Sequence, residues 1–317
     1  MTLEQTQRRR QAVSTIHDIV AAMRAIAAGR IQRAGRALEA GRRYEDVVRR
    51  GIAAVAAQSS ADSLPLVNGR PPLLIVLTSE QPLCGAFNHA VLALAERRWQ
   101  AMNREGAQLV VVGQRGLRVL ARRGITPHVA ESGATTLQAV RDVVKRLAKM
   151  IDRRYASRSL GPLHIIYNRY QSVSEQLPTE ERLLPLDLSQ FRRQAPRANP
   201  VRRYLPVEDL MAGLVGEYAF ISLYRMAADS YASEQASRLV AMDGATRSTD
   251  RMVRSLVDLE RRERQQEVTR QVLELIAARF AATDDEVVSD FPESFSVTGT
   301  TEETRVQPVA TSAAELF

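Results

Sequence analysis

Apolar residues in the first part of the chain follow a coiled-coil spacing. Residues 3–58 contain no proline, and apolar side chains recur there at alternating steps of three and four residues. The series is Val13, Ile16, Val20, Met23 and Ala27, continued by Ile31, Ala34 and Leu38. Such spacing is typical of the narrow seam between two paired helices rather than of the broad stripe of a helix on a globular core. The pattern therefore predicts a long N-terminal helix with a partner helix along it.

A second long helix is predicted near the other end of the chain, over Leu210–Phe280. This stretch contains no proline, a residue that removes a helix hydrogen bond and clashes with the preceding turn. Apolar residues mark one face, at Leu214, Tyr218, Ile221, Ala228, Ala232, Leu239, Met242, Val253, Leu256, Val268, Val272 and Leu275. Residues 260–267, ERRERQQE, interrupt this face and are polar all round. A stretch of this kind is either solvated or in contact with a polar partner, and the pattern alone favours neither.

Between the two helices, short apolar runs alternate with helical patterns. The runs predict buried strands at Leu73–Leu77, Gln108–Gly113 and Pro162–Tyr167, a short strand near Ile125–Val129 and an edge strand at Leu183–Leu186. The intervening patterns predict helices at Ala90–Glu105, Leu117–Arg123 and Leu137–Tyr155. Strands that alternate with helices favour a mainly parallel sheet with crossover helices.

The predicted fold class is therefore α/β plus a long antiparallel α-helical coiled coil, with a Rossmann-like α/β domain inserted between the two helices. We expect an N-terminal helix over 1–60, an α/β domain over 70–190 and a C-terminal helix over 207–282 that pairs with the first. Residues 189–206 contain three prolines and are predicted to be a linker. Residues 283–317 are acidic, rich in Thr, Ser and Pro, and poor in aliphatic side chains, so we predict a disordered tail.

Charge is distributed unevenly along the chain. The net charge is +8, but residues 283–317 contain eight acidic residues and one arginine, which leaves +15 on the remainder. Only Lys145 and Lys149 are lysines, so 42 of the 44 basic residues are arginine. A surface for nucleic acid or another anionic partner is one interpretation. An arginine-rich composition with solvated helix faces is favoured instead, because the arginines are dispersed and aromatic residues, which form stacking platforms, make up only 5%.

The sequence offers little catalytic chemistry. No GxxxxGK[ST] loop is present, and Gly113-Gln114-Arg115-Gly116 lacks the three-glycine spacing of a dinucleotide site and is interpreted as an ordinary turn. The four histidines form no metal-ligand motif, and Cys84 is interpreted as a small buried residue. A single cysteine permits no internal disulfide, and we find no secretion signal and no membrane-spanning run. We therefore expect a cytoplasmic protein without catalytic site, cofactor or metal.

Several motifs in this sequence resemble the gamma subunit of rotary F-type ATP synthases, over residues 5–280. Residues 232–246, ASEQASRLVAMDGAT, are similar to the family signature ASEQAARMVAMKAAT. Residues 78–88, TSEQPLCGAFN, resemble the strand-loop STDRGLCGGLN. Residues 19–31, IVAAMRAIAAGRI, match ITKAMEMVAASKM loosely with Met23 in register. Residues 262–272, RERQQEVTRQV, correspond to KARQASITQEL, with Arg264, Gln265 and Thr269 matched.

The resemblance implies a rotor rather than an enzyme. It implies that the two helices form a shaft inside a ring of alpha and beta subunits, and that the α/β domain is a foot beside the epsilon subunit on the membrane c-ring. Such a subunit couples transmembrane ion flow to ATP synthesis or hydrolysis in other chains, at the cytoplasmic face of the inner membrane, without inserting into it. Carried over by position, Met23 lies opposite Arg238 in a region that affects coupling. By the same resemblance, Arg264 and Gln265 occupy positions that are expected to hydrogen-bond a loop of a beta subunit in the empty state.

Some positions depart from the family pattern. The Asp-Arg-Gly turn of the strand-loop is replaced by Glu80-Gln81-Pro82, and the acidic residue before a proline ahead of the long helix is replaced by Leu205, which puts the usual foot contact in doubt. The acidic tail is longer than is usual in the family. These departures suggest a divergent bacterial form, with the alternative sodium-type F-ATPases as a candidate group. The competing hypothesis is a basic coiled-coil protein that binds nucleic acid or another anionic partner.

Overall fold

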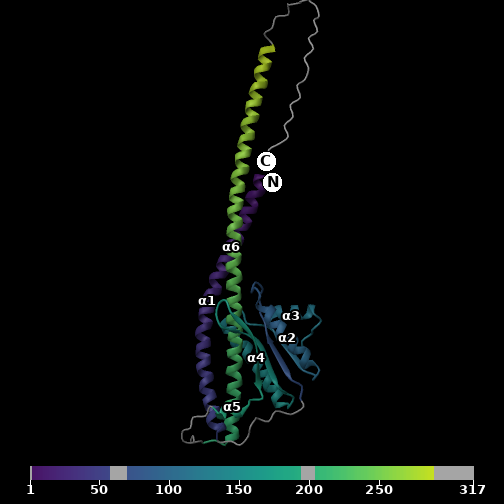
Figure 1. The fold of residues 1–317 in the computed structure, drawn as a ribbon, viewed down its shortest axis with the longest axis vertical. Helices are drawn as coiled ribbons and strands as arrows, with labels where there is room; N and C mark the ends of the chain where they lie inside the picture. Colours follow the sequence, from purple (N-terminus) through teal and green to yellow (C-terminus); the bar gives the residue numbers. More distant parts are fainter. Residues whose placement is uncertain (1, 58–69, 194–203, 289–317) are drawn as a thin grey trace, which may run out of the picture. The chain divides into compact units, whose positions relative to one another are not determined.

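The computed structural model describes residues 2–57, 70–193 and 204–288, with side chains as far as Phe280. The elements in order are α1 (Leu3–Ala56), β1 (Leu73–Leu77), α2 (Phe87–Asn103), β2 (Gln108–Val112), α3 (Gln114–Arg122), β3 (Val129–Glu131), α4 (Leu137–Ala156), β4 (Leu163–Tyr170), β5 (Gln176–Leu184), α5 (Leu188–Arg193) and α6 (Val207–Val288). The chain divides into two compact units, one of residues 3–258 and one that begins at Leu259. In the first unit, α1 and α6 lie side by side and the sheet lies against them (Figure 1).

The sheet has five strands in the order β3-β2-β1-β4-β5. The first four strands are parallel, and β5 runs antiparallel to β4 at the edge. Every residue of β1 is buried, because the sheet is covered on both faces. The predicted class, a mainly parallel α/β sheet inserted between two long helices, is confirmed.

Alternate residues of the central strands enter two separate cores. Leu73, Ile75 and Leu77 pack with residues of α1, α4 and α6, whereas Leu74 and Val76 pack with α2 and α3. This alternation follows from the two-residue period of a strand. Both long helices are therefore part of the core of the α/β domain.

Three local predictions in this region need correction. The edge strand β5 runs over Gln176–Leu184 instead of Leu183–Leu186, because it pairs with β4 along its whole length, from Tyr170↔Gln176 onwards. Its Pro178 is tolerated because the strand is at the edge. The short strand β3 begins at Val129, where the prediction placed its end. Part of the predicted linker forms α5, because Phe191 packs its ring edge-on against Tyr218; residues 194–203 are outside the described residues.

The two long helices pair in an antiparallel register. His17 contacts Asp250 and Arg24 contacts Asp243, each at 3.0 Å. Buried positions of α1 recur at multiples of seven residues, at Thr6, Val13, Ala27, Ala34, Gly41, Val48 and Val55, with Val20 half-buried, and a second series follows at Leu38, Glu45 and Ile52. A strict seven-residue repeat is the pattern of a left-handed coiled coil. The predicted antiparallel coiled coil is confirmed for residues 3–258.

Half of the predicted seam on α1 is wrong. Val13 and Ala27 are buried, but Ile16 and Met23 are 51% and 37% exposed. Towards the N-terminus, where Val13 and Ala27 lie outside the core of the α/β domain, only one position per heptad is buried. From Ala34 onwards α1 belongs to that core, and Leu38 and Ile52 are buried as well.

The helix α6 begins at the predicted start of the C-terminal helix and extends beyond its predicted end. It begins at Val207, and it continues to Val288, so the predicted start of the tail at Thr283 was too early. Residues 289–317, for which disorder was predicted, are outside the described residues. Val268, Val272 and Leu275, which the sequence places on the apolar face of this helix, are exposed in the described chain. Their spacing marks an apolar face without identifying what covers it.

No helix among the described residues is long and apolar enough to cross a membrane. Within the same ranges, no group of three or more His, Cys, Asp or Glu side chains could hold a metal ion.

Candidate functional site

The most unusual stretch of α6 is buried although it is polar. Ser233, Glu234 and Gln235 are each at most 5% exposed. The Oγ of Ser233 donates a hydrogen bond to the carbonyl oxygen of Asn168 (3.0 Å), and the Oγ of Ser237 donates one to Oε1 of Gln176 (2.7 Å). Hydroxyl groups on this part of α6 thus reach the end of β4 and the start of β5. We call the region where α6 meets these strand ends and the loop after β1 the polar junction.

Arg238 is the charged centre of the polar junction. Its Nη2 donates to Oε1 of Glu234 (2.7 Å) and to the carbonyl oxygen of Pro82 in the loop after β1 (3.3 Å). Arg238 is only 6% exposed, and its Nη1 has no hydrogen-bond partner in the described part of the chain. Burial raises the pKa of the Glu234 carboxyl to about 7, against the opposing charge of Arg238. Arg238 therefore joins α6 to the α/β domain from inside the molecule.

The loop after β1 is held by its own short hydrogen bonds. The Nδ2 of Asn88 donates to Oγ of Ser79 (2.7 Å), and the backbone N–H of Ser79 donates to Oδ1 of Asn88 (3.0 Å). Cys84 is buried, and its thiol donates to Oγ of Ser79 (3.3 Å). Burial raises the pKa of this thiol, which makes it unreactive. The interpretation of Cys84 as a small buried residue is confirmed.

The position where related folds hold a phosphate is filled by a side chain of this protein. In doubly wound sheets, anions bind at the carboxyl ends of the strands, at the N-terminus of a helix that follows a glycine turn. Here Oε2 of Glu80 accepts hydrogen bonds from the N–H groups of Gln114, the first residue of α3 (3.2 Å), and Gly133 (2.7 Å). The carboxylate replaces the phosphate, so this site is closed to an anionic ligand.

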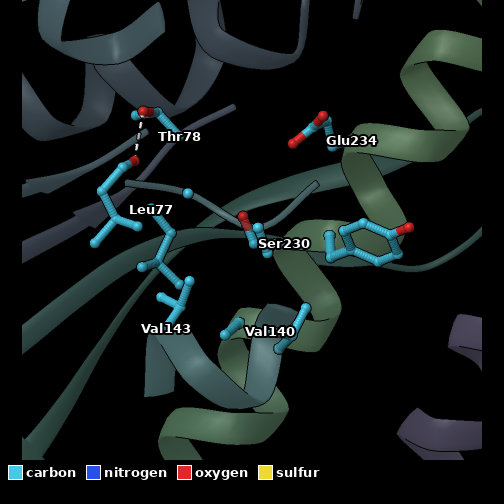
Figure 2. A pocket seen from close by; sticks show the side chains of 11 residues that line it. Leu77, Thr78, Val140, Val143, Ser230 and Glu234 are labelled. Carbon is cyan, nitrogen blue, oxygen red and sulfur yellow. Dashed lines mark hydrogen bonds between the residues drawn. The ribbon is translucent and has the colours of Figure 1, made fainter. Parts of the chain in front are cut away.

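A small cavity lies next to the polar junction. Its volume is about 30 Å³, and Leu77, Thr78, Val140, Val143, Ser230 and Glu234 are among the residues that line it (Figure 2). A space of this size holds a water molecule, whereas small-molecule sites usually span about 300–1,000 Å³. The crevice at the carboxyl ends of the strands therefore does not accommodate a nucleotide.

The structure does not bring Met23 level with Arg238. Arg24 pairs with Asp243, so the antiparallel register puts Met23 about level with Gly244. Arg238 is six residues earlier on α6, a distance of about 9 Å along the helix. Met23 is partly exposed and Arg238 is buried, so the two side chains have different surroundings.

The other site residues expected from the sequence lie on one helix of the second unit. Arg264, Gln265 and Thr269 are exposed on α6. Nη2 of Arg264 donates to Oε1 of Glu260 one turn earlier (3.3 Å), and Oγ1 of Thr269 donates to the carbonyl oxygen of Gln265 (2.9 Å). All three side chains are accessible to another molecule in the described chain.

One ionic cluster was not found from the sequence. Arg225 of α6 contacts Oε2 of Glu45 on α1 (2.7 Å), Oε2 of Glu181 on β5 (2.6 Å) and Oδ2 of Asp229 on its own helix (3.7 Å). Its Nη1 also donates to the hydroxyl of Tyr167 (3.1 Å). Burial raises the pKa of Asp229 to about 6, although Arg42 and Arg225 oppose the shift. No local signal reveals this Arg225 cluster, because its members come from four distant elements.

Comparison with known proteins identifies the family. A sequence model of the family described as ATP synthase matches residues 2–281. A protein of Fuscovulum blasticum named ATP synthase gamma chain is 30% identical, over 87% of this chain and 98% of its own. A protein of Bradyrhizobium sp. with the same name is 31% identical, over 82% and 92%. The chain belongs to the ATP synthase gamma-chain family. The predicted gamma-subunit resemblance is therefore confirmed.

Solved structures agree on the fold. A chain in the mitochondrial ATP synthase of Euglena gracilis, solved with OSCP, F1 and c-ring, superposes with a TM-score of 0.62 at 15% identity, over 93% of this chain and 99% of that chain. A chain in the central stalk and c-ring of the Tetrahymena thermophila enzyme gives a TM-score of 0.53 at 22% identity, over 72% and 99%.

Family membership also decides between the functional hypotheses. It confirms the prediction of a central-stalk rotor subunit that carries no catalytic site, and it does not favour the alternative of a nucleic-acid-binding coiled coil. The closed crevice at Glu80 gives a physical reason why a gamma chain with a nucleotide-type fold need not bind a nucleotide there.

The polar junction should make the stability of the chain depend on pH. The folded chain holds the proton on Glu234 more tightly than the unfolded chain, so stability should fall as pH rises from about 4.5 to about 7. A shift of this size corresponds to a loss on the order of 3 kcal/mol. In Glu234→Gln the loss should shrink to the part that comes from Asp229. Denaturant unfolding between pH 4.5 and 8 measures this loss of stability. Glu39→Gln, an exposed change on α1, is the control. If the free energy of unfolding falls with pH as steeply in Glu234→Gln as in the wild type, the raised pKa does not belong to Glu234.

Proposed function

We propose that this chain turns inside a ring of alpha and beta subunits and stands on a membrane c-ring, next to an epsilon subunit. In this role it couples transmembrane ion flow to ATP synthesis or hydrolysis at catalytic sites of other chains. The observation that supports the proposal most strongly is the match to the ATP synthase family over residues 2–281, together with relatives named ATP synthase gamma chain. Residues 1–60 and 207–288 serve as the shaft, and residues 70–190 as the foot.

A rotor must transmit torque between its foot and its shaft without yielding. Three features of residues 3–258 support this role: the ion-paired register of α1 and α6, the polar junction at Arg238, and the Arg225 cluster. Each connects α6 to a different element, and the last two connect it to the α/β domain. We expect the foot and the adjoining part of the shaft to rotate as one body.

The location follows from the proposed assembly. The chain is peripheral, at the cytoplasmic face of the inner membrane, and is held there by the c-ring rather than by a membrane-spanning helix of its own. The ion is chosen in the membrane ring, so the assignment to a sodium-type enzyme stays a prediction.

Assembly tests the proposal directly. The full chain, expressed together with alpha and beta subunits of the same organism, should co-purify with them as a complex that hydrolyses ATP. A chain that fails to assemble, and that binds duplex DNA with an affinity falling steeply with salt, would instead support the basic nucleic-acid-binding alternative.

Coupling is proposed to depend on Arg264 and Gln265, with Thr269, Met23 and Arg238 as further candidates. Arginine pairs bidentately with carboxylates, and the exposed pair with Glu260 is weak, so Arg264 can exchange it for a beta-subunit carboxylate.

Removal of Arg264 and Gln265 tests this assignment. The double change Arg264→Ala with Gln265→Ala should slow ATP hydrolysis and ATP-driven ion pumping by roughly tenfold or more, the effect of losing one hydrogen bond to a charged group. Both rates are measured on the complex in sealed vesicles. Gln266→Ala, an exposed neighbour on the same helix, is the matched control. If the double variant hydrolyses ATP and pumps ions at wild-type rates, neither residue takes part in the coupling contact.

A further inference from the structure

A second, much larger hollow lies outside the polar junction. It is a cleft of about 900 Å³ between α1, the N-terminus of α4 and α6, and we call it the basic cleft. Four cations and two tyrosines dominate its lining, namely Arg30, Arg33, Arg141, Lys145, Tyr224 and Tyr231. The lining contains one carboxylate, Asp142, so the basic cleft has a clear excess of positive charge.

Most of these cations are not used inside the protein. Arg33 donates from Nε to the carbonyl oxygen of Gly29 (3.3 Å) on its own helix. The side chains of Arg30, Arg141 and Lys145 form no hydrogen bond or ion pair with another residue in the described ranges. Like charges gathered in one concave surface repel one another, and an anion in the cleft relieves that repulsion.

The start of α4 adds hydrogen-bond donors to the cleft. Thr136 caps the helix, because its side chain accepts from the N–H of Ala139 (3.2 Å). Leu137 and Gln138 are among the lining residues, their N–H groups form no hydrogen bond within the described chain, and no acidic residue lies in the first turn. This helix has 20 residues, so its N-terminus carries the partial positive charge of a full helix dipole.

Tyr231 adds a hydrogen-bond donor to the cleft. It is only 4% exposed and lines the cleft, yet its hydroxyl has no hydrogen-bond partner among the described residues. Burial raises the pKa of Tyr231, although Arg30 and Arg33 oppose the shift, so the hydroxyl keeps its proton and can donate. The hydroxyl is not among the fully buried atoms that lack a partner, so it opens to the cleft and is available to an anion there.

We propose that the basic cleft binds a diphosphate or polyphosphate anion, such as inorganic pyrophosphate or the phosphate chain of a nucleotide. Guanidinium groups pair bidentately with phosphate oxygens, and helix N-termini bind phosphate through free N–H groups. The cleft volume lies in the range of small-molecule sites, about 300–1,000 Å³. An acidic protein segment spreads single charges along its length, whereas the cleft concentrates four cations and several neutral donors in one place. That arrangement favours a compact, multiply charged anion.

The two lysines of the chain permit a direct test on the full-length protein. Lys145 lines the basic cleft, and Lys149, one turn later on the same helix, does not. Amine acetylation followed by mass spectrometry reports both rates in one sample. Pyrophosphate and ADP, each at matched ionic strength, should slow the acetylation of Lys145 several-fold and leave Lys149 unchanged. Equal slowing of both lysines, or none at Lys145, would overturn the proposal.

Variants distinguish specific binding of pyrophosphate in the basic cleft from non-specific attraction of the anion to the positively charged protein. Arg30→Gln and Arg141→Gln should each weaken the pyrophosphate protection of Lys145 by about tenfold, as expected for loss of one charged hydrogen bond. Arg118→Gln, an exposed arginine on α3, should leave the protection unchanged. If a glutamate-rich peptide protects Lys145 and pyrophosphate does not, the cleft is a protein-docking surface and the proposal is wrong. The readout does not depend on assembly, so it stands or falls separately from the rotor function.

Discussion

Arg225→Met is expected to destabilise the chain by about 3–5 kcal/mol, the usual cost of removing one partner from a buried ionic group. The guanidinium lies between Glu45, Glu181 and Asp229, and its side chain is 12% exposed. Methionine fills a similar volume, so the loss comes from three carboxylates left close together without their central cation. The measurement is the free energy of unfolding at pH 7.5, from denaturant titration of the full chain.

Controls for the Arg225 cluster separate charge from geometry. Arg225→Lys keeps the charge but cannot reach three carboxylates with one planar fork, so it should recover only part of the loss. Arg247→Met removes an exposed pair with Asp243 and should cost less than about 1 kcal/mol. The penalty of Arg225→Met should shrink towards pH 5, because protonation neutralises Asp229, whose pKa is about 6. A penalty that is independent of pH would show that packing, rather than charge, is lost.

Gly113→Ala is expected to cost about 3–5 kcal/mol, from backbone strain and a steric clash together. Gly113 has φ +105°, a conformation that residues with a Cβ rarely adopt. A Cβ at this position would lie 2.4 Å from the carbonyl oxygen of Thr78 and 2.8 Å from that of Ser79. Neither oxygen can move freely, since the N–H of Thr78 donates to the carbonyl oxygen of Val112 (2.8 Å) and the carbonyl of Ser79 accepts from Arg115 (3.1 Å).

Gly124 provides the matched control for Gly113. It has φ +73°, but a Cβ there would meet nothing within 4 Å. Gly124→Ala should therefore cost only the left-handed backbone strain, about 1–2 kcal/mol. The difference between the two variants measures the clash against the strand end. Equal losses, by denaturant unfolding of the full chain, would mean that the turn at Gly113 is free to shift.

Much of the fold could be predicted because its signals are local. Five consecutive buried residues at Leu73–Leu77 define a central strand, and alternation with helices gives the parallel sheet. The hairpin partner β5 was mostly missed, because its central residues 179–182 are polar and become a strand only by pairing with β4. The same limit applies to α5, which depends on Phe191 reaching Tyr218.

The candidate sites also divide into features with a local sequence signal and features that depend on tertiary contacts. The motif around Glu234 and Arg238 could be found because its residues are contiguous, but the sequence did not reveal that Arg238 is buried and bonded to Pro82. The Arg225 cluster and the basic cleft could not be found at all, since each combines side chains from elements far apart in the chain.

The sequence by itself determined the family, the two long helices and the α/β insertion, because periodicity and contiguous motifs are encoded residue by residue. Tertiary structure decided which part of each periodic pattern is buried. On α1 it buried both heptad positions from Ala34 onwards, where the helix joins the core of the α/β domain, and left Ile16 and Met23 on the flank of the N-terminal part. It also placed the Glu80 carboxylate at the N-terminus of α3 and thereby closed the crevice. Those outcomes depend on distances between remote segments, which a linear pattern does not contain.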